Sequence, residues 1–402
     1  MLLLRPDTFA LTLLLALLTM IGPLSTDMYL PSLPDMARLL STDAARMQLT
    51  LSSYLVGFAC GQIIYGPVSD RHGRKPVVLV ALGIFGVSSL VCALTSSIEA
   101  LIVARFFQAF GGSGAVVLAR AIVRDLYSGA RAGRELSLMG MIMALAPVIA
   151  PVIGGVLQTY FGWRANFIIL IGIAALAALA VRFLLPETLR HRAPEAISLV
   201  PVLRIYRTLA RNRGFVAYLG IVAACYAGLF AWISGSPFVL QDLYGLSAFG
   251  FGVTFAAGCS GYMIGAWLAS HLVMRLGIDR TIGLGGAALS AGGLLMLASV
   301  ALDWRSGAAL AVPIAVYLMG LGLTLPMATA GALTPFPERA GAASSLMGFA
   351  QQTSAAALGA IVGHLLGASA WPMALAVAGA GLLTLSIWFF TRGVRAREAA
   401  RH

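Results

Sequence analysis

The chain has 402 residues, of which 59% are hydrophobic and only 10% carry a formal charge. A soluble domain carries about 25% charged residues, so this composition excludes an ordinary soluble enzyme. The net charge of +12 would suggest a nucleic-acid partner in a soluble protein, but here the basic residues lie between long apolar runs. The composition therefore predicts an all-α membrane protein that crosses the bilayer several times.

Twelve apolar stretches are long enough to cross a bilayer, for which a helix needs about 20 residues. They cover residues 8–30, 47–68, 76–96, 98–119, 135–160, 163–185, 214–237, 246–271, 281–302, 307–331, 337–367 and 369–391. We expect two pseudo-symmetric bundles of six transmembrane helices, at 1–186 and 214–391, because many transporters are duplicated in this way. A basic cytoplasmic linker at 187–213 would join them, and 392–402 would form a cytoplasmic tail.

The basic residues are distributed unequally between alternate connecting segments. Four of the 27 Lys and Arg residues, Arg38, Arg46, Arg164 and Arg305, fall on one side, and 22 fall on the other. Cytoplasmic loops carry the excess of Lys and Arg, so the richer side is expected to be cytoplasmic. The sequence thus predicts a multi-pass protein of the bacterial inner membrane with both termini in the cytoplasm. It suggests no metal site, no cofactor and no nucleic-acid partner.

Only one acid and one base lie clearly inside the apolar stretches, Asp27 in the first and Arg105 in the fourth, whereas the other charged residues stand at their ends or in loops. A charge at the centre of a bilayer costs about 3 kcal/mol on insertion scales, so such residues are usually paired or functional. Both lie near the outer ends of spans in the same half, and we expect them to form a buried pair. Two alternatives stay open: Asp27 could be an interfacial acid at a helix end, and Arg105 could reach the outer headgroups.

A polar string follows the second apolar stretch and reads Gly66-Pro-Val-Ser-Asp70-Arg71-His-Gly73-Arg74-Lys75. Glycine at position 73 permits a tight turn, and Asp70 stands where it can meet the positive end of another helix. The string resembles the G-x-L-a-D-r-x-G-r-k loop of the major facilitator superfamily. This resemblance implies a cytoplasmic gate in which Asp70 faces the eleventh span, near Thr334 to Glu338. A merely basic inner loop is the alternative.

Two further strings resemble the same superfamily. The segment that starts at Arg105 is similar to its R-x-x-q-G string, with Ala109 in place of the glycine. The fifth stretch is similar to the g-x-x-x-G-P-x-x-G-G signature of its antiporters, although alanines replace two of the glycines. The residues of this antiporter-like helix are Pro147, Pro151, Gly154 and Gly155. Generic packing of small residues with proline kinks is the alternative.

The segments Pro23 to Pro34 and Gln48 to Pro67 look like the Bcr/CflA branch of drug:proton antiporters, which includes bicyclomycin and chloramphenicol exporters. That resemblance implies proton-driven export of small antibiotics or toxic compounds by alternating access. Asp27 would be the proton site and Arg105 would tune it. The expected partners are a small-molecule substrate, protons and the lipid bilayer, and the expected state is a monomer. Candidates for the substrate cavity are Tyr29, Tyr54, Gln62, Gln108, Trp232 and Gln351. Packing within the spans is the alternative role for the last five.

Two other functions fit parts of the sequence. An uptake symporter or facilitator could use the same fold, because a fold does not determine the direction of transport. The string Gly111-Gly112-Ser113-Gly114 matches the G-x-S-G string of rhomboid-type intramembrane proteases. A protease would need a histidine at the depth of Ser113 to activate the hydroxyl, and no histidine in the sequence is expected there.

Overall fold

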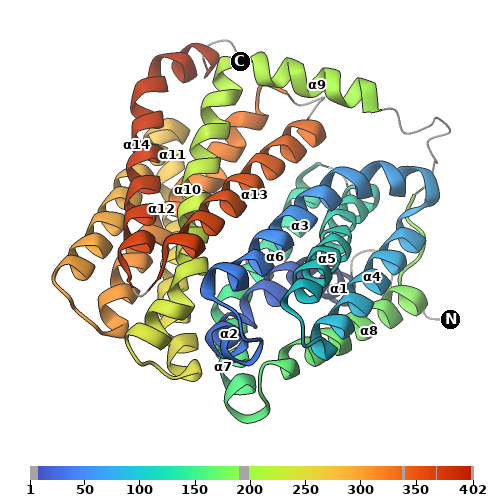
Figure 1. Cartoon of the computed structure of the whole chain (residues 1–402). Helices are drawn as coiled ribbons and strands as arrows, with labels where there is room; N and C mark the ends of the chain where they lie inside the picture. Colours follow the sequence, from blue (N-terminus) through green and yellow to red (C-terminus); the bar gives the residue numbers. More distant parts are fainter. Residues whose placement is uncertain (1–7, 128, 190–198, 337–339, 368, 400–402) are drawn as a thin grey trace. The chain divides into compact units, whose positions relative to one another are not determined.

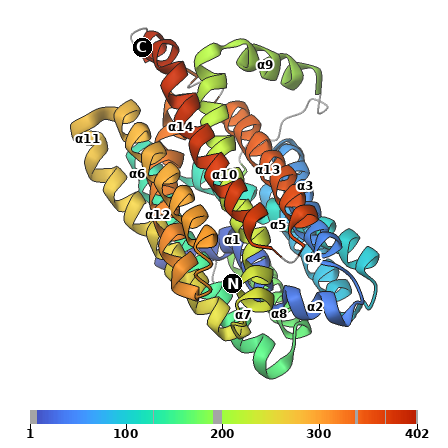
Figure 2. The ribbon, with the colours of Figure 1, turned by 60° about the vertical axis from the view of Figure 1, so that its left-hand side comes forward.

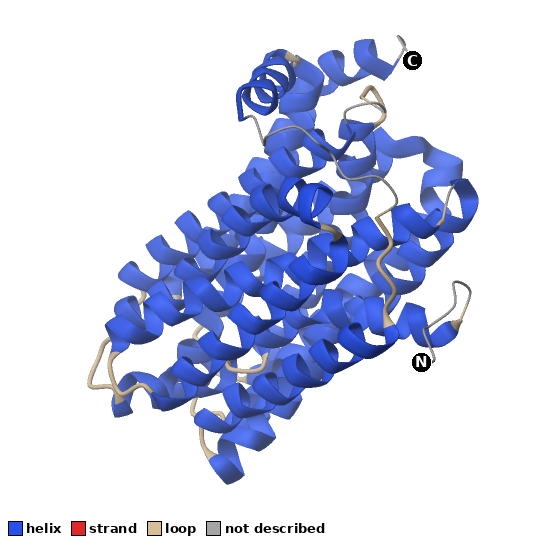
Figure 3. Cartoon of the chain, turned by 90° about the vertical axis from the view of Figure 1, so that its right-hand side faces the viewer, coloured by secondary structure: helices blue, strands red, loops and turns tan. Residues whose placement is uncertain are grey.

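The computed structural model describes residues 8–127, 129–189, 199–336, 340–367 and 369–399. All regular elements in these ranges are helical, and the described residues contain no strand (Figures 1 and 3). The chain forms two compact units, Met1–Thr42 with Leu49–Ile197 and Asp43–Gln48 with Ser198–His402. The predicted all-helical architecture is therefore confirmed for the described part of the chain.

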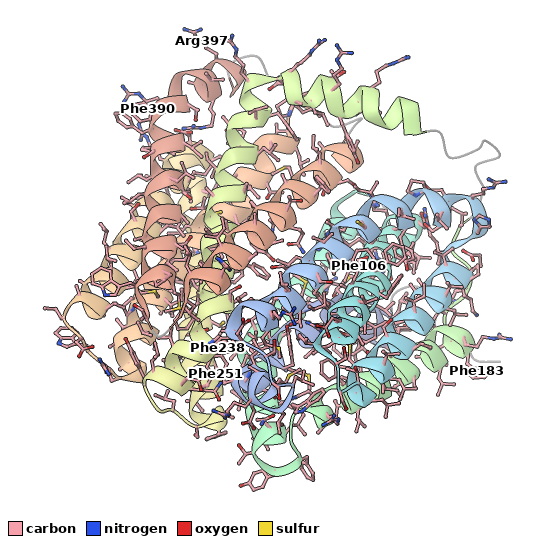
Figure 4. All side chains as sticks on the ribbon, in the orientation of Figure 1. Phe106, Phe183, Phe238, Phe251, Phe390 and Arg397 are labelled. Carbon is pink, nitrogen blue, oxygen red and sulfur yellow. The ribbon has the colours of Figure 1, made fainter. Side chains whose placement is uncertain are left out.

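Large apolar side chains on the outer faces of the helices are exposed. Phe183 is 48% exposed and Phe390 is 81% exposed, and both project outward from their helices (Figure 4). Among the described residues, ten helices are long and apolar enough to cross a membrane. Exposed apolar surface on this scale would be unfavourable in water, so it is the surface expected to contact lipid.

The first unit contains nine helical elements in the described ranges. They are α1 (Phe9–Asp27), η1 (Leu30–Ser32), α2 (Leu33–Leu39), α3 (Ala44–His72), α4 (Arg74–Leu94), α5 (Ile98–Leu126), α6 (Gly129–Ala144), α7 (Ala146–Phe161) and α8 (Arg164–Leu184). Helix α1 packs against α5, α6, α7 and α8, and α4 packs against both α5 and α8. The core of this unit therefore surrounds α1, the helix that ends at Asp27.

The first span is longer than predicted. We expected it to end at residue 30, but a helical path continues through η1 and α2 to Leu39. Pro31 and Pro34 stand in the first turns of η1 and α2, where proline is compatible with a helix because its missing N–H has no partner to lose. Asp27 therefore lies at a break within this helical path. Its depth in the membrane and the interfacial alternative stay predictions.

The fifth predicted stretch is not one helix. Helix α6 ends at Ala144 and α7 begins at Ala146, with a tight turn at Leu145, whose N–H donates to the Ile142 carbonyl at 3.1 Å. Pro147 explains the break, because it has no N–H for the carbonyl four residues earlier and its ring crowds that carbonyl. The fifth stretch therefore does contain a proline kink, which was one part of the alternative given for it, the packing of small residues with proline kinks.

The second unit contains seven helical elements in the described ranges. They are α9 (Leu199–Arg211), α10 (Arg213–Phe238), η2 (Val239–Leu243), α11 (Ala248–Ala301), α12 (Gly307–Leu333), α13 (Ala340–Leu365) and α14 (Trp371–Ala399). Helix α14 packs against α10 and α11, and α11 packs along α12 (Figure 2). The linker predicted at 187–213 thus contains a helix, α9, whose Leu209 is buried in the same core cluster as Phe215.

The helices of this unit do not correspond one to one with the six predicted spans. Helix α11 is 54 residues long and contains the stretches predicted at 246–271 and 281–302, with a turn at Gly277, whose φ is 76°. Helix α13 is not among the ten candidate spans. The helical part of the predicted tail reaches Ala399, because α14 continues beyond residue 391. The total of twelve spans stays a prediction.

Candidate functional site

Arg105 is completely buried in the first unit, on α5. Its guanidinium carbon lies 4.2 Å from the centre of the Tyr29 ring and 4.3 Å from that of the Tyr54 ring. Its Nη1 donates to the Ser25 carbonyl at 2.9 Å and to Gln108 Oε1 at 2.5 Å. The alternative that Arg105 reaches the outer headgroups is wrong, because its side chain lies inside the helical bundle.

Each of the two rings is fixed by its own hydroxyl. Tyr29, between α1 and η1, shares a hydrogen bond of 3.0 Å with Thr50 Oγ1. Tyr54, on α3, shares a hydrogen bond with Ser25 Oγ on α1. Cation–π contacts contribute about 2 kcal/mol when they are desolvated, and both rings contact the same cation. The two tyrosines therefore satisfy much of the charge that Arg105 brings into the apolar interior.

Three of the six cavity candidates are thus neighbours of Arg105. Tyr29 and Tyr54 contact its guanidinium faces, and Gln108 accepts from it while donating to Ser89 Oγ at 2.7 Å. All three are at most 2% exposed. Their role in binding substrate is untested, whereas their contact with Arg105 is direct.

Asp27 is buried, with 6% of its surface exposed, but it does not pair with Arg105. No hydrogen bond or ion pair of its carboxyl group is found among the residues that the structure describes. The expected pair is therefore wrong for this conformation. Arg105 meets α1 on the side of Ser25, and Asp27, two residues later, is rotated from Ser25 by about 200° around the helix axis.

The antiporter-like helix α7 contacts the chain directly after Asp27. A Cβ atom on Gly154 would lie 1.8 Å from the Met28 carbonyl oxygen, far inside van der Waals contact. Only a glycine permits this approach of α7 to the end of α1. Gly155 and Pro151 are also buried, and Pro147 stands in the first turn of α7. Of the antiporter-like residues, Gly154 thus lies beside the residue that follows the predicted proton site.

The predicted tight turn at Gly73 is confirmed, because its φ of 101° is favourable only for glycine. Directly after it, the Arg74 side chain is 9% exposed and lies between two carboxylates. Its Nη1 donates to Asp70 Oδ1 at 2.5 Å and its Nε donates to Asp125 Oδ2 at 2.9 Å. Asp125, at the end of α5, was missed in the sequence analysis. It lies far along the chain from the gate string.

Glu187, just after α8, is a second residue that the sequence analysis missed. Its carboxylate accepts from the backbone N–H of Arg74 at 2.9 Å and of Lys75 at 3.2 Å, and so caps the first turn of α4. Lys75 Nζ also donates to the Leu185 carbonyl at 2.7 Å. An acid at a helix N-terminus is favoured by the helix dipole. The only feature of the sequence that could have indicated this role of Glu187 is its position, just after the predicted cytoplasmic end of the sixth span.

The other residues of the gate string are less enclosed. Arg71 is exposed and Gly66 borders open space. The Asp70 side chain is 49% exposed, and within the described part of the chain its carboxylate pairs with Arg74. Its predicted contact near Thr334 to Glu338 stays a prediction, because Pro337 and Glu338 lie outside the described residues.

We expect Arg74→Ala to destabilise the first unit by about 1–3 kcal/mol, because it leaves the partly buried Asp125 carboxylate without its cation. The measurement is the fraction of folded monomer that detergent-solubilised protein retains after heating. Arg71→Ala is the matched control, since the exposed neighbouring arginine should be replaceable at little cost. Equal heat stability of the two variants would refute the structural role of Arg74.

The remaining cavity candidates are scattered. Gln62 and Gln351 are half-buried, and Trp232 is fully buried, with its ring stacked on Phe255 at 6.1 Å between centroids. A groove of about 830 Å³ lies between α4 and α5, and Phe107, 49% exposed, is among its mainly apolar lining residues. None of the six candidates lines this groove. Substrate binding by Gln62, Trp232 and Gln351 stays a prediction.

The geometry around Ser113 does not fit a nucleophile. Its hydroxyl donates to the Phe110 carbonyl at 2.7 Å, one turn earlier on α5. None of the histidines that the structure describes, at 72, 271 and 364, forms a hydrogen bond with it, and His72 and His271 instead bond to backbone carbonyls on their own helices. In the described part of the chain, no group of three His, Cys, Asp or Glu side chains could hold a metal ion.

Comparison with known proteins identifies the family. The sequence profile of the Major Facilitator Superfamily matches residues 15–360. The chain is 33% identical to multidrug resistance protein D of Escherichia coli (strain K12), with 96% of each chain covered. The chain belongs to the major facilitator superfamily. As a member, it is a multi-pass membrane transporter and not an enzyme, so the protease alternative is wrong.

Other relatives refine this assignment. The chain is 29% identical to a bicyclomycin resistance protein homolog of Haemophilus influenzae, over 98% of this chain and 99% of that protein. This transporter thus belongs to the Bcr/CflA branch of the superfamily's drug:proton antiporters, as the sequence motifs implied. A crystal structure of the nucleoside transporter NupG matches with a TM-score of 0.76 at 14% identity, covering 96% of this chain and 99% of that one. At this identity the match supports the fold alone.

Proposed function

We propose that this transporter is a proton-coupled efflux antiporter that exports small antibiotics or toxic compounds across the bacterial inner membrane. The observation that carries the proposal is the buried position of Asp27 at a break within the first span, beside the antiporter-like helix α7. A transporter driven by protons needs a group inside the membrane that gains and loses one. The names of the multidrug and bicyclomycin resistance relatives support the substrate class.

The mechanism that fits this assignment is alternating access. Two conformations open to opposite sides, and a proton or a substrate shifts their populations by binding one more tightly. Asp27 is the proton site, and Arg105 acts on it through the electric field, since the two groups do not touch in this conformation. Gly154 links helix α7 to the end of α1, where Asp27 lies. Because the backbones of Gly154 and Met28 are in contact, any movement of α7 is transmitted to Met28, the residue after Asp27.

We further propose that both termini and the linker at 187–213 are cytoplasmic, with 1–186 and 214–391 as the two halves and the protein acting as a monomer. The unequal distribution of Lys and Arg supports this orientation. In a variant without its native cysteines, a membrane-impermeant thiol reagent added outside cells should label a cysteine at Asp43. It should spare a cysteine at Arg204 on α9. The opposite pattern would reverse the topology.

The coupling is tested in energised inside-out vesicles with an acidic lumen. Addition of a drug should release protons from the lumen if drug and proton move in opposite directions. Drugs are chosen from a broad panel as those to which expression makes an efflux-deficient host more resistant. An uptake symporter or facilitator, the second candidate, would instead carry protons inward with the substrate or move none. No drug-dependent proton release with any drug that gives resistance would refute the antiporter.

A further inference from the structure

The groove between α4 and α5 lies on the outer surface of the first unit. The two helices run antiparallel and are joined by the short loop 95–97 (Figure 1). The groove has a volume of about 830 Å³, and its lining residues Val87 and Val103 are 65% and 57% exposed. It therefore opens on the apolar surface that is expected to contact lipid.

The length of the groove matches one lipid chain. On α5 its lining residues run from Glu99 to Phe107, and on α4 they run from Val91 back to Gly83. Eight residues of helix rise by about 12 Å. The hydrocarbon layer of one bilayer leaflet is about 15 Å thick. The groove thus extends from the loop at the helix ends through most of one leaflet.

Small residues provide the space in the groove. Gly83 lies at the deep end, far from the loop, and a Cβ atom there would meet nothing within 4 Å. Ala100 and Ala104 line the groove on the α5 side. Apolar atoms that face an empty space lose dispersion contacts, which a hydrocarbon chain in the groove would restore.

The end of the groove beside the loop is charged. Glu99, in the first turn of α5, is the only charged residue among the described residues that line the groove. Its Oε2 accepts from Ser97 Oγ at 2.8 Å, and a carboxylate can accept several hydrogen bonds at once. Arg164, at the start of α8, donates to the Thr95 carbonyl at 3.2 Å. An anion and a cation thus adjoin the same loop.

We propose that this groove binds phosphatidylethanolamine, with an acyl chain between α4 and α5 and the ammonium group at Glu99. The ammonium group has three N–H donors, and its bond to a carboxylate is strengthened by charge. Arg164 offsets the repulsion between Glu99 and the lipid phosphate. Phosphatidylglycerol lacks the cation, and the cation of phosphatidylcholine has no N–H donor, so both should bind less well.

The test is photo-crosslinking of the full-length protein in lipid nanodiscs. Analogues of phosphatidylethanolamine, phosphatidylcholine and phosphatidylglycerol carry the same diazirine in the acyl chain, and mass spectrometry measures their crosslinks to the residues that line the groove. The ethanolamine analogue should label these residues about fivefold more than the choline analogue, which is the upper range for an exposed ion pair.

Two substitutions test the two parts of the site. Glu99→Gln keeps the size of the side chain but removes its charge, so the ethanolamine and choline analogues should label equally. Gly83→Leu fills the deep end of the groove, so labelling by all three analogues should fall. Asp303→Asn and Gly172→Leu are the matched controls, since Asp303 is another exposed acid and a Cβ atom at Gly172 also meets nothing within 4 Å. Both controls should label like the wild-type protein.

Three results would overturn the proposal: equal labelling of the wild-type protein by the ethanolamine and choline analogues, a preference that survives Glu99→Gln, or wild-type labelling in Gly83→Leu. Stronger labelling by the glycerol analogue would also overturn it and would assign the groove to an anionic lipid. None of these measurements involves transport, so the lipid site can be refuted while drug export stands, and it can be confirmed in a protein that exports no drug.

Discussion

Asp27→Asn is expected to abolish drug accumulation driven by a pH gradient while leaving drug binding intact. Asparagine keeps the shape of the side chain but cannot release a proton, and Asp27 is the buried acid at the break in the first span. Binding should survive because the neutral amide resembles the protonated acid. The measurement is drug uptake into inside-out vesicles with an acidic lumen, compared with drug-for-drug exchange in the absence of a gradient.

Asp303→Asn is the matched control for this prediction. Asp303 is an exposed acid in the loop after α11, paired with Arg305 at 2.8 Å, and exposed pairs contribute little to stability. Its φ of 53° is a conformation that asparagine also adopts readily, so the variant should fold and transport normally. If Asp27→Asn accumulates drug against the gradient as well as this control does, Asp27 is not the proton site.

Gly154→Ala is expected to destabilise the transporter by about 1–3 kcal/mol and to reduce export strongly. The added methyl group would lie 1.8 Å from the Met28 carbonyl oxygen. A backbone atom cannot rotate away as a side chain can, so α7 or the end of α1 must shift. Because Met28 follows Asp27, this shift also moves the predicted proton site. Heat stability in detergent and drug export in vesicles measure the two effects.

Gly172→Ala on α8 controls for the change in helix propensity. A Cβ atom at Gly172 would meet nothing within 4 Å, and alanine is favoured over glycine in a helix by about 1 kcal/mol. This control should therefore be neutral or slightly more stable than the wild-type protein. Wild-type stability and export in Gly154→Ala would show that the contact with Met28 is not required.

The sequence by itself determined the features that depend on local chemistry. Apolar runs of sufficient length predicted helices that cross the bilayer, because a lipid interior requires every backbone group to be bonded within the segment. Glycine at position 73 predicted the tight turn, because a backbone conformation such as its φ of 101° is favourable only for glycine. The strings near Asp27, Arg105 and Asp70 also identified the superfamily, since these residues recur at fixed spacings.

The end of the first span was predicted wrongly for a related reason. Pro31 directly follows the predicted end of the span, but a proline is compatible with the first turn of a new helix, and the local sequence does not show that the helical path resumes there. Pro147 likewise stands in the first turn of a new helix, α7, directly after the break that ends α6. Whether the helical path resumes after such a break depends on the packing of the chain on either side of it.

Only the tertiary structure decided which groups meet. Asp27 and Arg105 lie at positions that suggested a pair, but which face of α1 is turned toward α5 depends on how the helices pack, and here it is the face of Ser25. The same packing brought Tyr29 and Tyr54 onto Arg105, and Asp125 and Glu187 onto the start of α4. Such contacts join residues far apart in the chain, and a change of about 100° in the rotation of a helix would replace the contacts that its side chains make.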